Sequence, residues 1–526
     1  MKMGEITPIT VIPVVPGQTY NLDLTTVIKT APLSVAPMDG AVFKAFAFYQ
    51  ANRNTWDNYP YWFGEKKYPE NPEKEPTYLV PKIKMPATGC KYNGFFDNIG
   101  VSPTAKNYKI DAYLHRMHLQ IKNTYFRNQS LENAIEVNTG DQDDVYTEEL
   151  DTLFKISRQR DLFAQCLPTQ SGPEDIEIPL GTTAPVYGTG KTLGLTDGIT
   201  NTAIINQTVA GDTGIYYSRN SLYGKKVGTT EGAEGGRLTT VNRGIGVTSD
   251  PNNSGLAVDL SKAVGAPLQG LYQAIAANAL EYVKSRGGNR YFEQLANVYN
   301  ITNPDQVLRL PEFLGSVQKM IDFDTVTQTS QTENQQSGLG YRGANGYLED
   351  FSHIVSKSFG EFGWIIIYGV ITYTPKYQQG VTRLFNTEDP LDLFCPYFNR
   401  MGDEPIFLDE IYAQDPSVVN EQGVPMNDTV WGYGKRNSRI LYPVNEVHGE
   451  QRSTYPQSLD KNIFSEAYTS APGLNKDWDK VDDSGFKRAL AVTDETQFIC
   501  NSIVSGVQDI EIPLDAVPSP IPDQIM

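Results

Sequence analysis

The longest run of β-branched and aromatic residues lies at 363–373, where the chain reads Gly-Trp-Ile-Ile-Ile-Tyr-Gly-Val-Ile-Thr-Tyr. The run contains no charged residue, and Pro375 follows it closely. Such side chains favour strands, whereas three β-branched residues in a row crowd the preceding turn of a helix. Because apolar positions do not alternate with polar ones, the pattern predicts a strand that is buried on both faces. This strand needs a second sheet or a layer of helices to cover it.

Two earlier stretches also have the pattern of strands. Residues 19–24 read Thr-Tyr-Asn-Leu-Asp-Leu, and this alternation is typical of a half-buried strand. Residues 42–49 carry three phenylalanines among small and polar residues and predict a further strand. The amino-terminal part of the chain is therefore expected to be built from successive strands.

Residues 53–65 contain five aromatic side chains, more than one face of a helix or strand can hide. We therefore expect some of these side chains to pack against a neighbouring chain or a covering loop. They form our candidate subunit interface: Trp56, Tyr59, Tyr61, Trp62 and Phe63.

Helical spacing of apolar residues is confined to a few segments. Residues 119–132 predict a short helix with Leu119, Ile121 and Tyr125 facing inward. Residues 259–300 predict a helical insertion that covers the sheet, with Ser261 as the N-cap of its first helix. Two glycines end that helix, and a second short helix is expected to follow them.

The segment 187–258 has a different composition, rich in Gly, Thr, Asn and Ser and poor in aliphatic residues. It is too long for an ordinary connection, so we expect a protruding lobe with some strand content. The polar and aromatic side chains of its middle are candidates for contact with another surface: Tyr216, Tyr217, Arg219 and Tyr223. Residues 511–526 contain four prolines and predict an extended tail that lies on a partner.

Composition narrows the classes of function. The chain has 526 residues and a net charge of −18, and an acidic surface of this kind repels nucleic-acid phosphates. Its four cysteines are scattered without a CxxC pair, so we expect them reduced and mostly buried. Residues 1–15 lack the pattern of a signal peptide, and no apolar run reaches the length of a membrane span. We expect no membrane insertion and cytosol-like conditions.

Three possible chemical sites fail on inspection. His115 and His118 would share a helix face, but no glutamate or third ligand accompanies them, so a pair of partly exposed histidines is expected. The acidic residues of 141–151 lack the glycine that a calcium loop needs, which favours a solvated loop leading into a helix. Residues 185–192 nearly match a phosphate-binding loop, but Pro185 replaces its first glycine. We expect no enzyme, cofactor or metal site.

Several segments of the chain match one protein family in content, order and spacing. They are Pro16–Leu22, Ala36–Asp39, Trp56–Asn58, Phe63–Glu65, Tyr125–Gln129, Ile178–Val186, Arg309–Gly315, Tyr377–Gly380, Glu410–Gln414 and Val430–Gly434. These segments resemble the major capsid proteins of microviruses, in particular those of gokushovirus-like single-stranded DNA phages. The resemblance leaves out mainly residues 187–258 and the two tails.

The resemblance implies a mainly β fold, in which residues 1–526 form one viral jelly roll of eight antiparallel strands with large inserted loops and a few short helices. It also implies self-assembly into a T=1 icosahedral capsid, in a virion assembled in the host cytoplasm. The expected partners are other copies of the chain, packaged single-stranded DNA, a small basic DNA-binding capsid protein and a host surface receptor. The resemblance makes the lobe at 187–258, with its four candidate residues Tyr216, Tyr217, Arg219 and Tyr223, the part expected to contact the host. A jelly-roll carbohydrate-binding module is the alternative, because aromatic-rich loops suit it as well.

Overall fold

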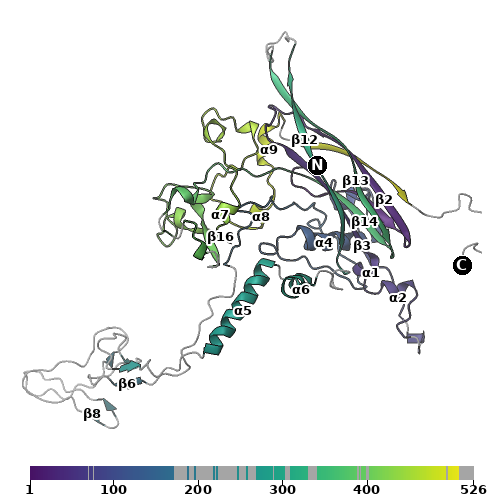
Figure 1. Cartoon of the computed structure of the whole chain (residues 1–526). Helices are drawn as coiled ribbons and strands as arrows, with labels where there is room; N and C mark the ends of the chain where they lie inside the picture. Colours follow the sequence, from purple (N-terminus) through teal and green to yellow (C-terminus); the bar gives the residue numbers. More distant parts are fainter. Residues whose placement is uncertain are drawn as a thin grey trace, which may run out of the picture. The chain divides into compact units, whose positions relative to one another are not determined.

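The computed structural model of the chain (Figure 1) describes residues 1–170, 268–301 and 309–508, together with six short strands between residues 186 and 258. Within these ranges it leaves out residues 69, 71, 75, 288–289, 330–339, 388–389, 391–392, 399–401 and 493–495. Contacts divide the chain into two compact units. The first comprises Met1–Ser171 and Val283–Met526, and the second comprises Gly172–Tyr282.

The first unit is built on one antiparallel sheet, which has seven strands in the described part of the chain where eight were expected. Its strand order is β1 (Thr7–Val14), β14 (Gly363–Thr372), β3 (Ala41–Ala51), β12 (Glu312–Thr327), β13 (Arg342–Phe359), β2 (Gln18–Thr30) and β17 (Phe498–Gln508). Both strands predicted near the amino terminus are present, as β2 and β3. The sheet is nearly closed and barrel-like, consistent with the jelly-roll class that the sequence predicted.

Strand β12 links the two halves of this sheet. Its first part, Glu312–Ile321, pairs with β3, and its last part, Asp322–Thr327, pairs with β13. In Figure 1, β12 and β13 run together beyond the neighbouring strands as a two-stranded ribbon. Apolar residues from β3 and β14 share a core with residues from β2 and β13, so the two halves face each other.

Strand β14 is buried on both faces, which confirms the prediction made from its sequence. Ile365, Ile367 and Ile371 point into the core between the two halves of the sheet. Ile366 and Val370 point the other way, into a second core. Since successive strand residues alternate between faces, each face of β14 has its own covering layer.

The second core is covered by helices α3 (Phe95–Asn98) and α4 (Tyr113–Ile121), and α4 continues into a π-helical turn, η2 (Lys122–Phe126). Leu119 and Ile121 face inward as predicted, whereas Tyr125 remains partly exposed. The prediction of partly exposed histidines was wrong, because His115 and His118 are both buried. They stack on the rings of α3, and this aromatic burial removes them from solvent.

The first unit also contains short helices, turns and strands that are not part of this sheet. Its other helices are α1 (Asn52–Thr55), α2 (Tyr59–Phe63), α6 (Tyr291–Tyr299), α7 (Ser438–Leu441), α8 (Lys476–Asp479) and α9 (Ser484–Ala489). Its 3₁₀ turns are η1 (Pro72–Lys74), η5 (Arg383–Phe385), η7 (Pro396–Phe398), η8 (Leu408–Glu410), η9 (Met426–Asp428), η10 (Gly449–Gln451) and η11 (Asp460–Asn462). Its further strands are β4 (Lys82–Lys84), β5 (Lys109–Asp111), β15 (Asp403–Phe407) and β16 (Val430–Lys435). A third apolar cluster around Trp431 and Trp478 joins several of these segments.

In the second unit, short antiparallel pairs link β6 (Val186–Gly188) with β11 (Leu256–Val258), β7 (Leu195–Thr196) with β10 (Gly246–Val247), and β8 (Tyr217–Ser218) with β9 (Ser221–Leu222). Helix α5 (Leu268–Gly287) follows them in the chain, and its last residues, from Val283, belong to the first unit. In the first unit, α6 is the second short helix that the sequence predicted. The predicted N-cap Ser261, most of residues 185–192 and the tail 511–526 lie outside the described residues.

All four cysteines are free thiols. Cys90 and Cys166 are buried, and Cys395 and Cys500 are half-buried, in agreement with the expectation of reduced and mostly buried side chains. In the part of the chain that the structure describes, none of the helices combines the length and the apolar character needed to cross a bilayer.

Candidate functional site

Helix α2 presents an exposed aromatic surface, which we call the α2 surface and define as Tyr59, Tyr61, Trp62 and Phe63. The helix begins with Pro60 in its first turn, where the missing amide proton carries no penalty, and ends at Gly64. Gly64 has a φ of +126°, a conformation that favours glycine. Trp62 and Phe63 are 46% and 63% exposed, so their large rings lie at the surface of the folded chain.

The rings of the α2 surface are held by other aromatic side chains. Tyr59 and Phe63 stack with 6.2 Å between their centroids, and Phe63 also contacts Phe362 at 5.6 Å. Tyr61 stacks on Tyr78 at 5.7 Å. These contacts fix one side of each ring, while Trp62 and Phe63 still present area to solvent.

Trp56 lies beneath this surface and is fully buried, so in the folded chain it supports the exposed rings instead of forming part of the surface. Its ring contacts Trp62 at 6.2 Å, and its indole Nε1 donates a hydrogen bond of 2.6 Å to Asp141 Oδ1. Asn58 donates to both oxygens of the same carboxylate, at 2.9 and 2.8 Å. Asp141 therefore fixes the segment that leads into α2.

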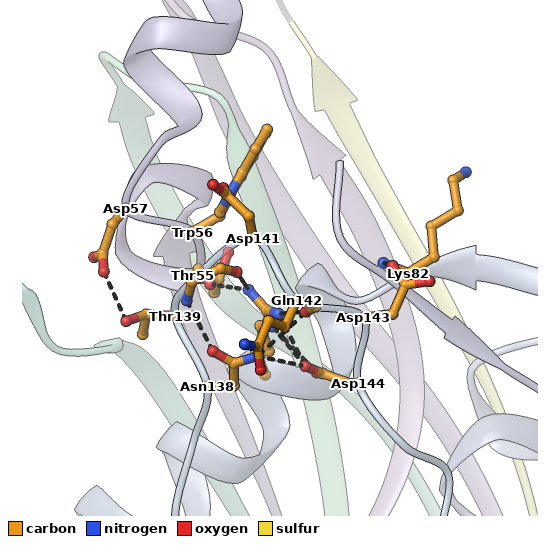
Figure 2. Close-up of polar contacts among 12 residues, drawn as sticks. Thr55, Trp56, Asp57, Lys82, Asn138, Thr139, Asp141, Gln142, Asp143 and Asp144 are labelled. Carbon is orange, nitrogen blue, oxygen red and sulfur yellow. Dashed lines mark hydrogen bonds and ion pairs between the residues drawn. The ribbon is translucent and has the colours of Figure 1, made fainter. Parts of the chain in front are cut away.

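The loop at 138–144 is fastened by the guanidinium of Arg116, which extends from α4 and is completely buried. Its Nη1 donates to the carbonyl oxygens of Thr55 (3.1 Å) and Gly140 (3.0 Å). Its Nη2 donates to the carbonyl oxygen of Gln142 at 2.8 Å and to Asp144 Oδ1 at 2.9 Å. Figure 2 shows how these loop residues converge beside Thr55 and Trp56. One buried cation thus joins α4, α1 and the loop under the α2 surface.

The same loop corrects the prediction for residues 141–151, because part of this acidic stretch is structural and no helix follows it. Asp151 is completely buried and accepts the backbone N–H groups of Lys91 (2.8 Å) and Phe96 (3.0 Å). The hydroxyl of Tyr146 donates to Asp151 at 2.7 Å. Asp143 remains at the surface, where a hydrogen bond from Lys109 lowers its pKa.

A second exposed apolar segment was missed by the sequence analysis. Phe385 and Tyr397 are 84% and 93% exposed, and they lie in two short 3₁₀ turns, η5 and η7. Leu384, just before Phe385, is also exposed, as are Leu393 and Phe394 between Phe385 and Tyr397. The signal in the sequence was the apolar content of residues 381–398 without a helical or strand period, which also occurs in ordinary loops.

The four residues named as a host-contacting group lie apart from these surfaces in the chain. Only Tyr217 falls within the described residues, in β8, and Tyr216, Arg219 and Tyr223 lie outside them. Among the described residues, no group of three or more His, Cys, Asp and Glu side chains is arranged to hold a metal ion. The site with the most developed geometry is therefore an exposed aromatic surface on a rigid support, which suits binding to another macromolecule.

Comparison with known proteins identifies the family of the chain. The chain matches the family described as capsid protein (F protein) over residues 1–519. It is 28% identical to the capsid protein VP1 of Bdellovibrio phage phiMH2K over 506 residues, which cover 94% of this chain and 87% of the relative. It is 27% identical to the VP1 proteins of Spiroplasma virus 4 (98% and 92% covered) and Chlamydia phage 1 (95% and 90% covered).

These matches confirm the resemblance to the microvirus capsid proteins that the short sequence segments indicated. They also agree with a structural, non-enzymatic role. The chain therefore belongs to the capsid protein (F protein) family and is a structural capsid protein of the microvirus type.

Proposed function

We propose that copies of this chain assemble into a closed T=1 icosahedral shell that encloses a single-stranded DNA genome in the virion. The observation that supports this proposal most is the α2 surface, because it exposes large aromatic rings on a support that does not need to rearrange. Aromatic side chains on rigid elements dominate the energy of many protein interfaces. A closed shell repeats such a contact around each symmetry axis until the ring closes.

We propose the α2 surface as a contact between neighbouring subunits, with Trp62 and Phe63 as its central residues. Burying both rings against a neighbour removes apolar area that is now exposed to water. The hydrogen bonds of Asp141 with Trp56 and Asn58 hold the helix before the contact forms, which lowers the entropy lost on association.

The negative net charge of the chain affects how a genome can be enclosed. With a net charge of −18, the subunit repels DNA phosphates on average, so it does not condense the genome by itself. We propose that a small basic DNA-binding protein supplies the neutralising charge inside the shell. Assembly takes place in the host cytoplasm, where both proteins and the DNA are present.

We also propose that residues 187–258 form an outward lobe that contacts a host surface receptor. Its support is the change in composition and the separate compact unit Gly172–Tyr282 that contains it. Deletion of residues 187–258 should leave shells intact and abolish adsorption to the host. Unchanged adsorption by such shells would contradict this role.

The proposed subunit contact is tested with matched substitutions at its two exposed rings. The double variant Trp62→Ser/Phe63→Ser should stay folded with only a small drop in its thermal unfolding transition, because about half of each ring is exposed, and should yield at least roughly tenfold fewer closed particles by negative-stain microscopy. The control Trp62→Phe/Phe63→Tyr keeps the aromatic area and should assemble like the parent. A folded Ser/Ser variant that assembles normally would refute this surface as a contact.

A further inference from the structure

The two edge strands of the main sheet differ in whether their free edge can pair with another strand. Strand β1 contains Pro8 and Pro13 and is interrupted by a bulge between Pro8 and Thr10, features that block pairing with another strand. Strand β17 runs for eleven residues, Phe498–Gln508, without a charged residue or a proline. In the described part of the chain, its only strand neighbour is β2. Edge strands of this length and composition are templates for another strand.

Hydrogen bonds at the start of β17 show which backbone groups point to the free edge. The N–H of Phe498 donates to the carbonyl oxygen of Met1 at 3.1 Å, and the terminal amine of Met1 donates to the carbonyl oxygen of Phe498 at 2.9 Å. On the other side, the carbonyl oxygen of Gln497 accepts the N–H of Ala31, which continues β2. Because these directions alternate along a strand, the even-numbered residues 500–506 direct their N–H and C=O groups to the free edge.

The odd-numbered residues of β17 direct their side chains to the outer face of the sheet. Ile499, Ile503 and Val507 are 63%, 61% and 70% exposed, although they are apolar. Ile503 lies opposite Thr25 of β2, and Thr25 lies opposite Phe351 of β13, which is also exposed. A row of Phe351, Thr25 and Ile503 therefore crosses the outer face and ends with an apolar side chain at the free edge of β17.

The three apolar residues are spaced symmetrically, four positions on either side of Ile503. We infer that β17 pairs antiparallel with β17 of a second copy around a two-fold axis centred on Ile503. In this register Ile503 lies opposite Ile503 of the second copy, Ile499 lies opposite Val507, and Asn501 lies opposite Ser505. The exposed apolar side chains of the two β17 strands then lie against one another across the axis.

The backbone directions agree with this register. Ser502 and Val504, whose amides point to the free edge, form the hydrogen-bonded pairs on either side of the axis. Ile503 becomes a non-hydrogen-bonded pair, the arrangement in which opposite side chains come closest. The contact is isologous, as two-fold symmetry requires, and it rests on the proposed shell, which contains such axes.

The composition of the carboxyl-terminal tail disfavours it as the occupant of this edge. Residues 509–526 contain Pro513, Pro518, Pro520 and Pro522, so they have no proline-free run longer than four residues before Pro518. Proline lacks the N–H that a ladder needs, and a partner for β17 has to supply a regular series of donors. A second β17, which has no proline, supplies them.

Cysteine cross-linking tests both the partner and the register. In assembled material, oxidation of Ile503→Cys should give a covalent dimer on a non-reducing gel, because opposite residues in such a pair have Cα atoms about 4.5 Å apart. The double variant Asn501→Cys/Ser505→Cys should give one as well. The control Ser505→Cys places its two thiols about 13 Å apart along the strand, so its dimer yield should be at least roughly tenfold lower.

The parent chain gives the background from its native thiols, of which Cys500 faces the opposite side of β17. Equal yields in all variants, or no dimer from Ile503→Cys, would overturn the inference. A cross-link between Ile503→Cys and Ile512→Cys that exceeds the Ile503→Cys homodimer would also overturn it, because the tail would then occupy the edge. Microscopy of the same samples separates the two questions: shells without the cross-link refute the β17 pairing and leave the proposed function standing, whereas the absence of shells refutes the proposed function.

Discussion

Asp144 receives three hydrogen bonds from the Arg116 guanidinium, two from Nε at 3.2 and 3.1 Å and one from Nη2 at 2.9 Å, in a place where the arginine side chain is completely buried. This pair holds the loop at 138–144 against α1 and α4, directly beneath the α2 surface. The surface that we propose for subunit contact therefore depends on an ion pair that is buried within the subunit.

Removal of Arg116 is the first test of this support. Arg116→Met leaves Asp144 without its cation and leaves three carbonyl oxygens without their donor. We expect the free energy of unfolding to fall by about 3–5 kcal/mol, measured by urea denaturation of unassembled chain. The control Arg53→Met removes an exposed cation that pairs with Glu361 and should cost about 1 kcal/mol or less. If the free energy of unfolding falls equally in the two variants, burial of Arg116 does not increase its contribution to stability.

The buried histidine His118 predicts a loss of stability in weak acid. Its ring lies between Phe95 and Phe154, its Nδ1 is 2.8 Å from the Tyr368 hydroxyl, and burial lowers its pKa well below 6.5. Below pH 6.5 the His118 side chain becomes protonated in the unfolded chain but stays neutral in the folded chain. The free energy of unfolding should therefore fall as the pH drops, by up to about 1.4 kcal/mol per pH unit for this residue.

Urea denaturation at pH 7.5, 6.0 and 5.0 measures this slope, and His118→Gln should reduce it. Burial also lowers the pKa of His115, so part of the slope should remain in that variant. A slope that is identical in the parent and in His118→Gln would contradict the assignment.

Titration of Asp409 should change the free energy of unfolding in the opposite direction with pH. Burial and the neighbouring Glu410 raise its pKa from 3.8 to about 6, and its Oδ1 is buried without a hydrogen-bond partner. The folded chain holds this proton more tightly than the unfolded chain, so stability falls as the pH rises from about 4 to 6. Asp409→Asn should raise the free energy of unfolding by about 1 kcal/mol at pH 7.5, allowing for solvent screening, and by little at pH 4. A gain that does not depend on pH would exclude titration of Asp409 as its cause.

The two faces of β14 can be tested separately. Ile366 and Ile367 are adjacent and both fully buried, but they belong to different cores. Each substitution to alanine should lower the free energy of unfolding by about 2–5 kcal/mol, because each leaves a cavity in a packed layer. If either variant loses less than about 0.5 kcal/mol, that face of the strand is not packed as described.

The sequence predicted β14 well because burial on both faces requires an uninterrupted apolar run, and few other structures use one. It predicted the α2 surface as a group, since five aromatic residues in one segment exceed what a single face can hide. It did not separate buried Trp56 from exposed Trp62, because that difference depends on Asp141, a residue far away in the chain. Partners distant in sequence leave no local pattern.

Two other features were missed for the same kind of reason. The burial of His115 and His118 depends on α3, whose phenylalanines approach them only in the folded chain. Strand β17 has apolar residues on both of its faces, so its outer residues do not stand out from its inner ones. Its free edge became visible only when the strand order was known.

The central claim is that identical copies of this chain close into a shell. Negative-stain microscopy of the purified chain, over a range of ionic strength and with and without its single-stranded DNA, tests it most directly. The account predicts closed particles of one uniform diameter. Particles that correspond to single chains under every condition would contradict it.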